Sequence, residues 1–246
     1  MNLRNLVDSV YDRYVSRLIS CTPRVGIGRL CGKKLPIYRA TINPEAKNSI
    51  FVVGGVHGDE SGGIEGILEY LTRGKFPNSI RIEFFPIMNP TGFIAGTRET
   101  KSGRDINRDL CSSSMSESTS SLIALAKKMK PKLFMSMHED ESINNFYMYY
   151  SDHNMKALWD RITRAAEDIF GLADGYIHGD KCINGLISHP LPKRTMSSPK
   201  HKCSIENAVH LMGIPYITTE TPKSYSMSKR CLFNRKIIDM VSKAYS

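Results

Sequence analysis

The residues of this chain that could carry chemistry lie in four segments, of which the first is residues 54–60, Gly-Gly-Val-His-Gly-Asp-Glu. His57 and Glu60 stand three residues apart on a turn that the glycines make tight. An imidazole and a carboxylate at this spacing can converge on one cation, with ligand bonds of roughly 2 Å. The alternative is an ordinary turn in which Asp59 or Glu60 caps the helix that follows.

A second imidazole, His138, directly follows the apolar residues 133–137. A lone histidine at the end of a strand is more often structural than a metal ligand. Together with His57 and Glu60, however, it completes a His-Glu-His set, and three ligands of this kind leave a position of a zinc ion open for water, as catalytic zinc sites require. The three residues therefore predict one zinc ion (Zn2+) per chain.

Residues that could bind an anion follow Asn89-Pro90, at Thr97-Arg98 and in the segment Asp105-Ile106-Asn107-Arg108-Asp109. Arginine presents a planar fork of donors that suits carboxylates and developing oxyanions, and Asn107 adds an uncharged donor. The alternative for this segment is a solvated, charged loop. Beside a metal ion, these side chains predict a site for an anionic group.

The fourth segment, residues 217–222, runs from an apolar strand into Thr-Glu-Thr-Pro. A glutamate that enters a pocket beside a cation is what a metal-dependent hydrolase needs as its general base. Glu220 could equally be the partner in a structural ion pair. Only in combination with the other three segments does it become a candidate general base.

In this order the segments resemble a known family: Gly-His-Gly-Asp-Glu, Asn-Pro-Thr-Gly, Thr-Arg, Asp-Ile-Asn-Arg, His138 and Thr-Glu-Thr. From about Gly54 to Pro222 the chain is similar to the zinc carboxypeptidases (carboxypeptidase A-like), and also to the related aspartoacylase and succinylglutamate desuccinylase branch. The resemblance implies an α/β fold, with a mixed, mostly parallel sheet of about eight strands flanked by helices.

The resemblance also implies roles for the residues that match its motifs. The zinc ligands would be the His-Glu-His set, with Glu60 chelating through both carboxylate oxygens. Glu220 would take a proton from the attacking water and pass it to the leaving amine. Arg98 would polarise the scissile carbonyl and hold the tetrahedral oxyanion, while Asn107 and Arg108 would clamp the free carboxylate of the substrate.

The chain departs from this family in two places. The larger carboxypeptidases carry a substrate-binding tyrosine on a mobile loop before the catalytic glutamate. Here residues 178–202 contain no tyrosine, and neither Tyr176 nor Tyr225 stands in that context. The interval between His57 and His138 is short, as in the compact members and the deacylase branch. The sequence therefore specifies the zinc chemistry better than it specifies the substrate.

These residues predict a zinc metallocarboxypeptidase that hydrolyses the amide bond of a C-terminal residue of a peptide, because a clamp for a free carboxylate restricts cleavage to the bond beside it. The alternative is a zinc-dependent N-acyl amino acid deacylase. A third hypothesis is a non-catalytic binding protein that uses the basic stretches 127–132, 193–202 and 223–236. The first two stretches contain no phenylalanine, tyrosine or tryptophan, and the third contains only Tyr225 and Phe233. This favours solvated loops, so we expect neither nucleic acid nor a membrane as partner.

Apolar periodicity predicts the elements that must position these side chains. Residues 3–19 place apolar side chains on one stripe of a helix, and this helix should pack on the domain because its polar face mixes acids with bases. Strands are expected at 35–42, 48–54, 79–88, 133–137, 146–150 and 215–219. Helices are expected at 62–72, 118–129, 153–170, 204–212 and 228–244, with a proline-punctuated loop over 175–202. The alternation predicts one α/β domain over residues 1–246, with its site at the strand ends.

Composition limits the class of protein. A chain of 246 residues that is 41% hydrophobic and 24% charged is ordinary globular sequence, which excludes collagen, coiled coils and disorder. The charged residues of the first twenty positions argue against a signal peptide, so we expect a cytoplasmic protein.

The six cysteines include no Cys-x-x-Cys pair and are expected to be reduced thiols. The net charge of +10 would favour encounters with acidic peptides.

Overall fold

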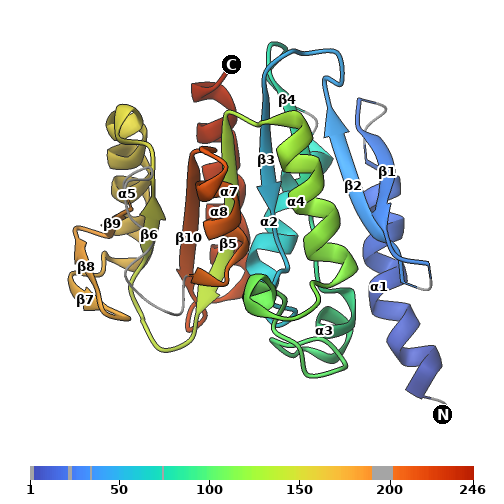
Figure 1. Cartoon of the computed structure of the whole chain (residues 1–246). Coiled ribbons are helices and arrows are strands. Elements are labelled where there is room, and N and C mark those ends of the chain that lie inside the picture. Colours follow the sequence, from blue (N-terminus) through green and yellow to red (C-terminus); the bar gives the residue numbers. More distant parts are fainter. Residues whose placement is uncertain (1–2, 22–23, 34, 74, 190–201) are drawn as a thin grey trace.

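Ten strands form one sheet in the computed structural model, which describes residues 3–21, 24–33, 35–73, 75–189 and 202–246 (Figure 1). The strands are β1 (Gly26–Cys31), β2 (Ile37–Ile42), β3 (Ser49–Val53), β4 (Arg81–Phe85), β5 (Leu133–Asp140), β6 (Tyr147–Tyr150), β7 (Gly175–Ile177), β8 (Asp180–Ile183), β9 (Leu186–Ser188) and β10 (Tyr216–Pro222). Their spatial order is β1, β2, β4, β3, β5, β10, β6, β9, β8, β7. The α/β class predicted from the sequence is confirmed, but the sheet has ten strands rather than about eight.

The centre of the sheet is parallel. Strands β4, β3, β5 and β10 run in the same direction, while β2 and β6 flank them in the antiparallel sense. All five residues of β3 are buried, as expected for a parallel strand with helices on both faces. The parallel centre matters for function because it brings the carboxyl ends of β3, β5 and β10 to one edge.

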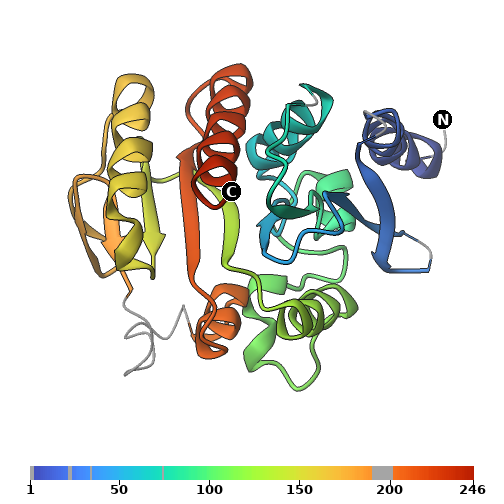
Figure 2. The same ribbon diagram turned by 90° about the horizontal axis from the view of Figure 1, so that it is seen from above.

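Helices cover both faces of the sheet, as Figure 2 shows from above. One face carries α1 (Leu3–Ile19), α2 (Ser61–Arg73), α5 (Lys156–Phe170) and α8 (Met227–Ala244), and the other carries α4 (Glu117–Met129) and α7 (Ile205–Leu211). Because successive side chains of a strand point to opposite faces, β3 gives Ile50 and Val52 to the first core and Phe51 and Val53 to the second.

Most of the predicted helices and strands are confirmed. The α1 helix packs on the domain as expected, because its residues Tyr11, Tyr14 and Leu18 are buried in the first core. The predicted helices at 62–72 and 118–129 are α2 and α4, which begin and end within one residue of those bounds. Among the helices of the described ranges, none is both long enough and apolar enough to cross a membrane.

The expected loop over 175–202 is wrong for residues 175–188, which form strands β7, β8 and β9. Each is only three or four residues long, too short to develop the alternating apolar pattern that identifies a strand. Two-residue turns, His178-Gly179 and Asn184-Gly185, connect them. The other part of this expectation, with Pro190, Pro192 and Pro199, lies outside the described residues, as does most of the basic stretch 193–202.

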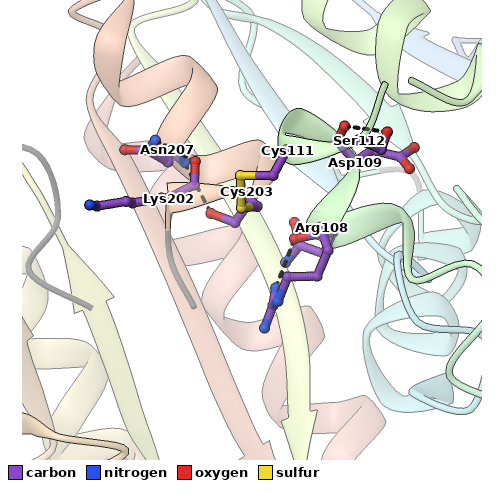
Figure 3. The surroundings of a disulfide bond; sticks show 9 residues. Arg108, Asp109, Cys111, Ser112, Lys202, Cys203 and Asn207 are labelled. Atoms are coloured by element: carbon purple, nitrogen blue, oxygen red, sulfur yellow. Dashed lines mark hydrogen bonds between the residues drawn. A yellow bond between two sulfur atoms is a disulfide. The ribbon is translucent and has the colours of Figure 1, made fainter. Parts of the chain in front are cut away.

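A disulfide joins Cys111 to Cys203 (Figure 3). The expectation of six reduced thiols is therefore wrong for this pair, whereas the other four cysteines are free: Cys21, Cys31, Cys182 and Cys231. Sequence spacing could not have paired the two residues, because 92 positions separate them. They meet because α7 packs beside the 3-10 helix η1 (Ile106–Cys111).

We expect the Cys111→Ser/Cys203→Ser double variant to lose about 2–4 kcal/mol of unfolding free energy, because a cross-link that closes a long loop restricts the unfolded chain. Chemical denaturation of the oxidised protein and of the double variant measures the difference. Added reductant should lower the denaturation midpoint of the wild type and leave that of the double variant unchanged. An equal response of both proteins to reductant would contradict the prediction.

Candidate metal centre and active site

The three predicted metal ligands meet at the edge where the parallel strands end. His57 and Glu60 lie on the turn between β3 and α2, and His138 is the sixth residue of β5. Strands β4 and β5 lie on opposite sides of β3. The chain passes from β3 to β4 through α2 on one face, and from β4 back past β3 to β5 through α4 on the other face. Such a topological switch point is where open α/β sheets place ligands.

The turn that carries His57 requires glycine for steric reasons. A Cβ at Gly58 would collide with the backbone of Gly92, in helix α3 (Pro90–Ala95). This close approach is held from the other side, because the Asn89 side chain accepts a hydrogen bond of 2.9 Å from the Gly92 N–H and caps α3. The Gly-His-Gly-Asp-Glu and Asn-Pro-Thr-Gly motifs therefore pack against each other.

The three side chains converge closely. His57 Nδ1 lies 2.6 Å from Glu60 Oε1, and His138 Nδ1 lies 2.9 Å from Glu60 Oε2. The two Nδ1 atoms are 3.1 Å apart, and all three residues are buried. One ligand atom from each therefore falls within 4.8 Å of the others.

The opposite nitrogen of each imidazole faces a carboxylate. His57 Nε2 lies 3.5 Å from Asp105 Oδ1, and His138 Nε2 lies 3.3 Å from Glu206 Oε1. An Nε2–H group that faces a carboxylate leaves the Nδ1 atom of the same ring with a free lone pair. Two lone pairs and a carboxylate then point at one place, which is the donor set of a tetrahedral zinc site with an open position. The residues present thus fit a zinc ion.

The electrostatics of the metal-free chain lead to the same conclusion. Burial opposes ionisation of Glu60, but His57 and His138 outweigh it and hold the pKa of that carboxyl well below its usual range. Burial also opposes protonation of His138, but Glu60 and then Glu206 raise its pKa well above the usual value. The cluster therefore attracts a positive charge, which in the metal-free chain is a proton.

Arg98 lies at the border of this cluster. Its Nε and Nη2 atoms donate hydrogen bonds of 3.1 and 2.9 Å to Asp105 Oδ2, while its Nη1 lies 3.2 Å from His57 Nδ1 and 3.8 Å from Glu60 Oε1. Asp105 thus fixes the guanidinium of Arg98 through two hydrogen bonds and lies near the imidazole of His57. This carboxylate was part of the motif read from the sequence, but no role was predicted for it.

Asn107 and Arg108 lie on η1, which is fastened to α7. The Ile205 N–H donates a hydrogen bond of 2.9 Å to Asn107 Oδ1, and the nearby disulfide joins Cys111, the last residue of η1, to Cys203, which lies just before α7 (Figure 3). Arg108 Nη1 donates a hydrogen bond of 2.7 Å to the Asn107 carbonyl oxygen, and both side chains line the cavity described next.

Glu220 completes the site from β10. It pairs with His138 across the parallel ladder and with Tyr147 across the antiparallel one. A cavity of about 360 Å³ is lined by the three ligand residues, Glu220, Arg98 and Arg108 among others. Burial, opposed by His138 and reinforced by Glu60, raises the pKa of Glu220 to about 8, closer to neutral pH than the pKa of an ordinary carboxyl, as suits a proton-transfer group.

The structure therefore brings every predicted site residue to one cavity, and it adds Glu206, which sequence reasoning missed. Glu206 is buried in the first turn of α7 and lines the same cavity. Nothing in its local sequence marks it, because a glutamate at the start of a helix is an ordinary first-turn residue. Only the packing of α7 against β5 gives it a histidine partner.

Comparison with known proteins finds a family model that matches part of this chain. Residues 46–140 match the family model of the succinylglutamate desuccinylase/aspartoacylase catalytic domain. The resemblance predicted from the sequence is confirmed. A search of curated protein sequences finds no match to this chain.

Solved structures share the fold. A candidate metallopeptidase from Shewanella denitrificans is 22% identical, with a TM-score of 0.79 over 95% of this chain and 89% of its own. A metallo-carboxypeptidase from Burkholderia cenocepacia is 12% identical, with a TM-score of 0.70 over 96% and 68%. The succinylglutamate desuccinylase/aspartoacylase of Rhodobacter sphaeroides is 18% identical, with a TM-score of 0.60 over 89% and 64%.

We expect Glu206→Gln to lower the affinity for zinc about 10-fold to 100-fold, because a carboxylate that orients a ligating imidazole typically contributes that much. Competition with a chromophoric chelator measures the dissociation constant. Glu141→Gln removes the same charge from an exposed residue of the cavity wall and should leave the affinity unchanged, whereas His57→Ala should abolish stoichiometric binding. Equal affinities of Glu206→Gln and the wild type would contradict the role given to Glu206.

Proposed function

We propose that this chain is a zinc-dependent metallocarboxypeptidase, which hydrolyses the amide bond of the C-terminal residue of a peptide. The observation that carries the proposal is the convergence of His57, Glu60 and His138 in one cavity that Glu220 and Arg108 also line. A metal-ligand set, a proton-transfer group and a cation for a carboxylate are the parts that such a reaction needs.

Zinc bound at this site would act as a Lewis acid on the scissile carbonyl and lower the pKa of water. Glu220 would accept a proton from the attacking water and deliver it to the leaving amine. Arg98, which Asp105 holds through two hydrogen bonds, would donate to the developing oxyanion, an interaction commonly worth about 3–4 kcal/mol. The outer carboxylates of Asp105 and Glu206 would hold the two imidazoles in the orientation that ligation requires.

The proposed specificity for a chain end rests on the anchoring of Asn107 and Arg108. Asn107 is buried and bonded to the first residue of α7, and the disulfide restrains the same pair of elements. A clamp on a rigid support can select a carboxylate at a fixed distance from the reacting bond. This selects the bond beside a free carboxyl group, which favours an exopeptidase.

A second candidate is the zinc-dependent N-acyl amino acid deacylase. It is favoured by the family match over residues 46–140, which contain the proposed metal ligands, Arg98, Asn107 and Arg108. In this reaction the clamp would hold the carboxylate of the acylated amino acid, so the same cavity serves both candidates. The two candidates differ in the acyl side of the substrate, which is a peptide chain for the carboxypeptidase and a simple acyl group for the deacylase.

We infer further that residues 1–246 act as one catalytic domain, which is supported by the single sheet that contains all ten described strands.

The cytoplasmic location stays a prediction. The Cys111–Cys203 disulfide bears on it, because disulfides are rare in the cytoplasm of mesophiles. Alkylation of free thiols in fresh cell lysate would show whether this pair is oxidised where the protein works.

A substrate panel tests the two candidates. Zinc-loaded protein is assayed with an N-acetyl dipeptide, its C-terminally amidated form and the N-acetyl derivative of the same C-terminal amino acid. We expect hydrolysis of the dipeptide, at least about 10-fold less for the amidated form because its clamp partner is gone, and slower hydrolysis of the N-acetyl amino acid. Preference for the N-acetyl amino acid would favour the deacylase, and hydrolysis of none of the three would contradict both candidates.

Glu220→Gln tests the proton-transfer role separately. The amide keeps the shape of the side chain but cannot accept the proton, so kcat should fall about 100-fold to 10,000-fold, while the zinc dissociation constant stays within about twofold of the wild-type value. Steady-state kinetics and metal titration measure the two quantities on the same preparation. Retention of most of the activity would show that another group accepts the proton.

A further inference from the structure

Two successive hairpin turns at the edge of the sheet differ in one informative residue. The β7–β8 turn is His178-Gly179 and the β8–β9 turn is Asn184-Gly185, each between directly paired strand residues. The first residue of each has a left-handed backbone, with φ of 51° at His178 and 50° at Asn184. Asparagine followed by glycine is the favoured sequence for such turns. Turn chemistry explains Asn184 but does not by itself explain His178.

Only the first of these turns reaches the cavity. His178 lines it together with Tyr147 and Asp140, and Asn184 does not. His178 Nε2 lies 2.9 Å from Asp140 Oδ2, which also accepts a hydrogen bond of 2.6 Å from the Tyr147 hydroxyl. Tyr147 in turn pairs with Glu220 across the β6–β10 ladder. His178 is therefore held in a defined orientation on the wall that carries the proposed general base.

The hydrogen bond to Asp140 leaves one ring nitrogen available. A neutral imidazole that donates from Nε2 to a carboxylate keeps a lone pair on Nδ1. Within the part of the chain that the structure describes, no residue forms a hydrogen bond with Nδ1 of His178. This atom can therefore accept a hydrogen bond from a bound molecule.

The position of His178 indicates which end of a substrate it meets. Arg108 and Asn107 come from η1, which follows β4, whereas His178 lies beyond β6 at the other end of the sheet. The Asn107 side chain is buried, while the His178 side chain is 40% exposed. Arg108, Glu220 and His178 line the same cavity, so a substrate held by its terminal carboxylate at Arg108 can extend its acyl portion past Glu220 to His178.

We propose that His178 is a positioning residue that accepts, through Nδ1, a hydrogen bond from the first amide N–H on the acyl side of the scissile bond. The inference rests on the proposed function and deepens it, because it names the substrate class: peptides with at least one further amide before the bond that is cut. An N-acyl amino acid with a simple acyl group has no such N–H. His178 thereby favours peptides over N-acyl amino acids.

The experiment removes first the donor N–H of the substrate and then the acceptor of the protein. The substrates are the N-acetyl dipeptide and its depsipeptide analogue, in which an ester oxygen replaces that N–H. The variant is His178→Asn, which keeps the left-handed turn but is too short to reach the substrate. Asn184→His, in the neighbouring turn outside the cavity, is the matched control, and thermal unfolding of all variants checks their folding.

We expect the wild type and Asn184→His to prefer the amide over the ester by about fivefold to tenfold in kcat/KM, mainly through KM, as one hydrogen bond of about 1 kcal/mol provides. His178→Asn should treat the two substrates alike. A structural role of His178 would instead lower both rates by the same factor, and a preference in His178→Asn equal to that of the wild type would overturn the proposal.

Binding separates failure of this inference from failure of the proposed function. Calorimetry with zinc-loaded Glu220→Gln protein measures the dissociation constants of the same two compounds with and without His178→Asn. If the wild type hydrolyses neither compound, the proposed function fails. The inference about His178 still stands if His178→Asn removes a binding preference for the amide, and it is overturned if no such preference exists.

Discussion

Two imidazole nitrogens and a carboxylate face one another at 2.6–3.1 Å where the central strands end. Much of the surrounding structure helps to offset the repulsion between these buried acceptors. Acceptors buried together repel unless a positive charge joins them. The chain supplies the conditions for that charge through Asp105 and Glu206, which face the outer nitrogens of the two rings. A cation at the centre would then be surrounded by the two imidazoles, with a carboxylate behind each ring.

The same constraint explains the steric detail of the β3–α2 turn. Glu60 must follow His57 closely enough for both to reach one point, so the turn runs against helix α3 with no room for a side chain at Gly58. The parallel arrangement of β3, β5 and β10 then sets the third ligand and Glu220 at the same edge. Neither β5 nor β10 alone would complete the site, because each contributes one essential side chain.

Elements from the second half of the sequence supply other parts of the cavity. Helix α7 gives Glu206, and its start is fastened to η1 by the Cys111–Cys203 disulfide and by the hydrogen bond to Asn107. On the opposite side, the short strands β7 to β9 extend the sheet past β6 and bring His178 to the wall next to Tyr147 and Asp140. The α7 side is thus cross-linked to η1, and the other side adds a histidine held by Asp140.

The sequence by itself predicted the His57-Glu60-His138 group, Glu220 and the two arginines of the site, because their types are chemically specific and their order along the chain resembles that of a known family. It also determined the alternation of helices and strands. The tertiary structure alone decided the partners that depend on contacts distant in the chain: Glu206 for His138, Cys203 for Cys111 and Asp140 for His178. Strands β7 to β9 escaped prediction because three or four residues are too few for a pattern, and their formation depends on pairing with β6, which no local propensity encodes.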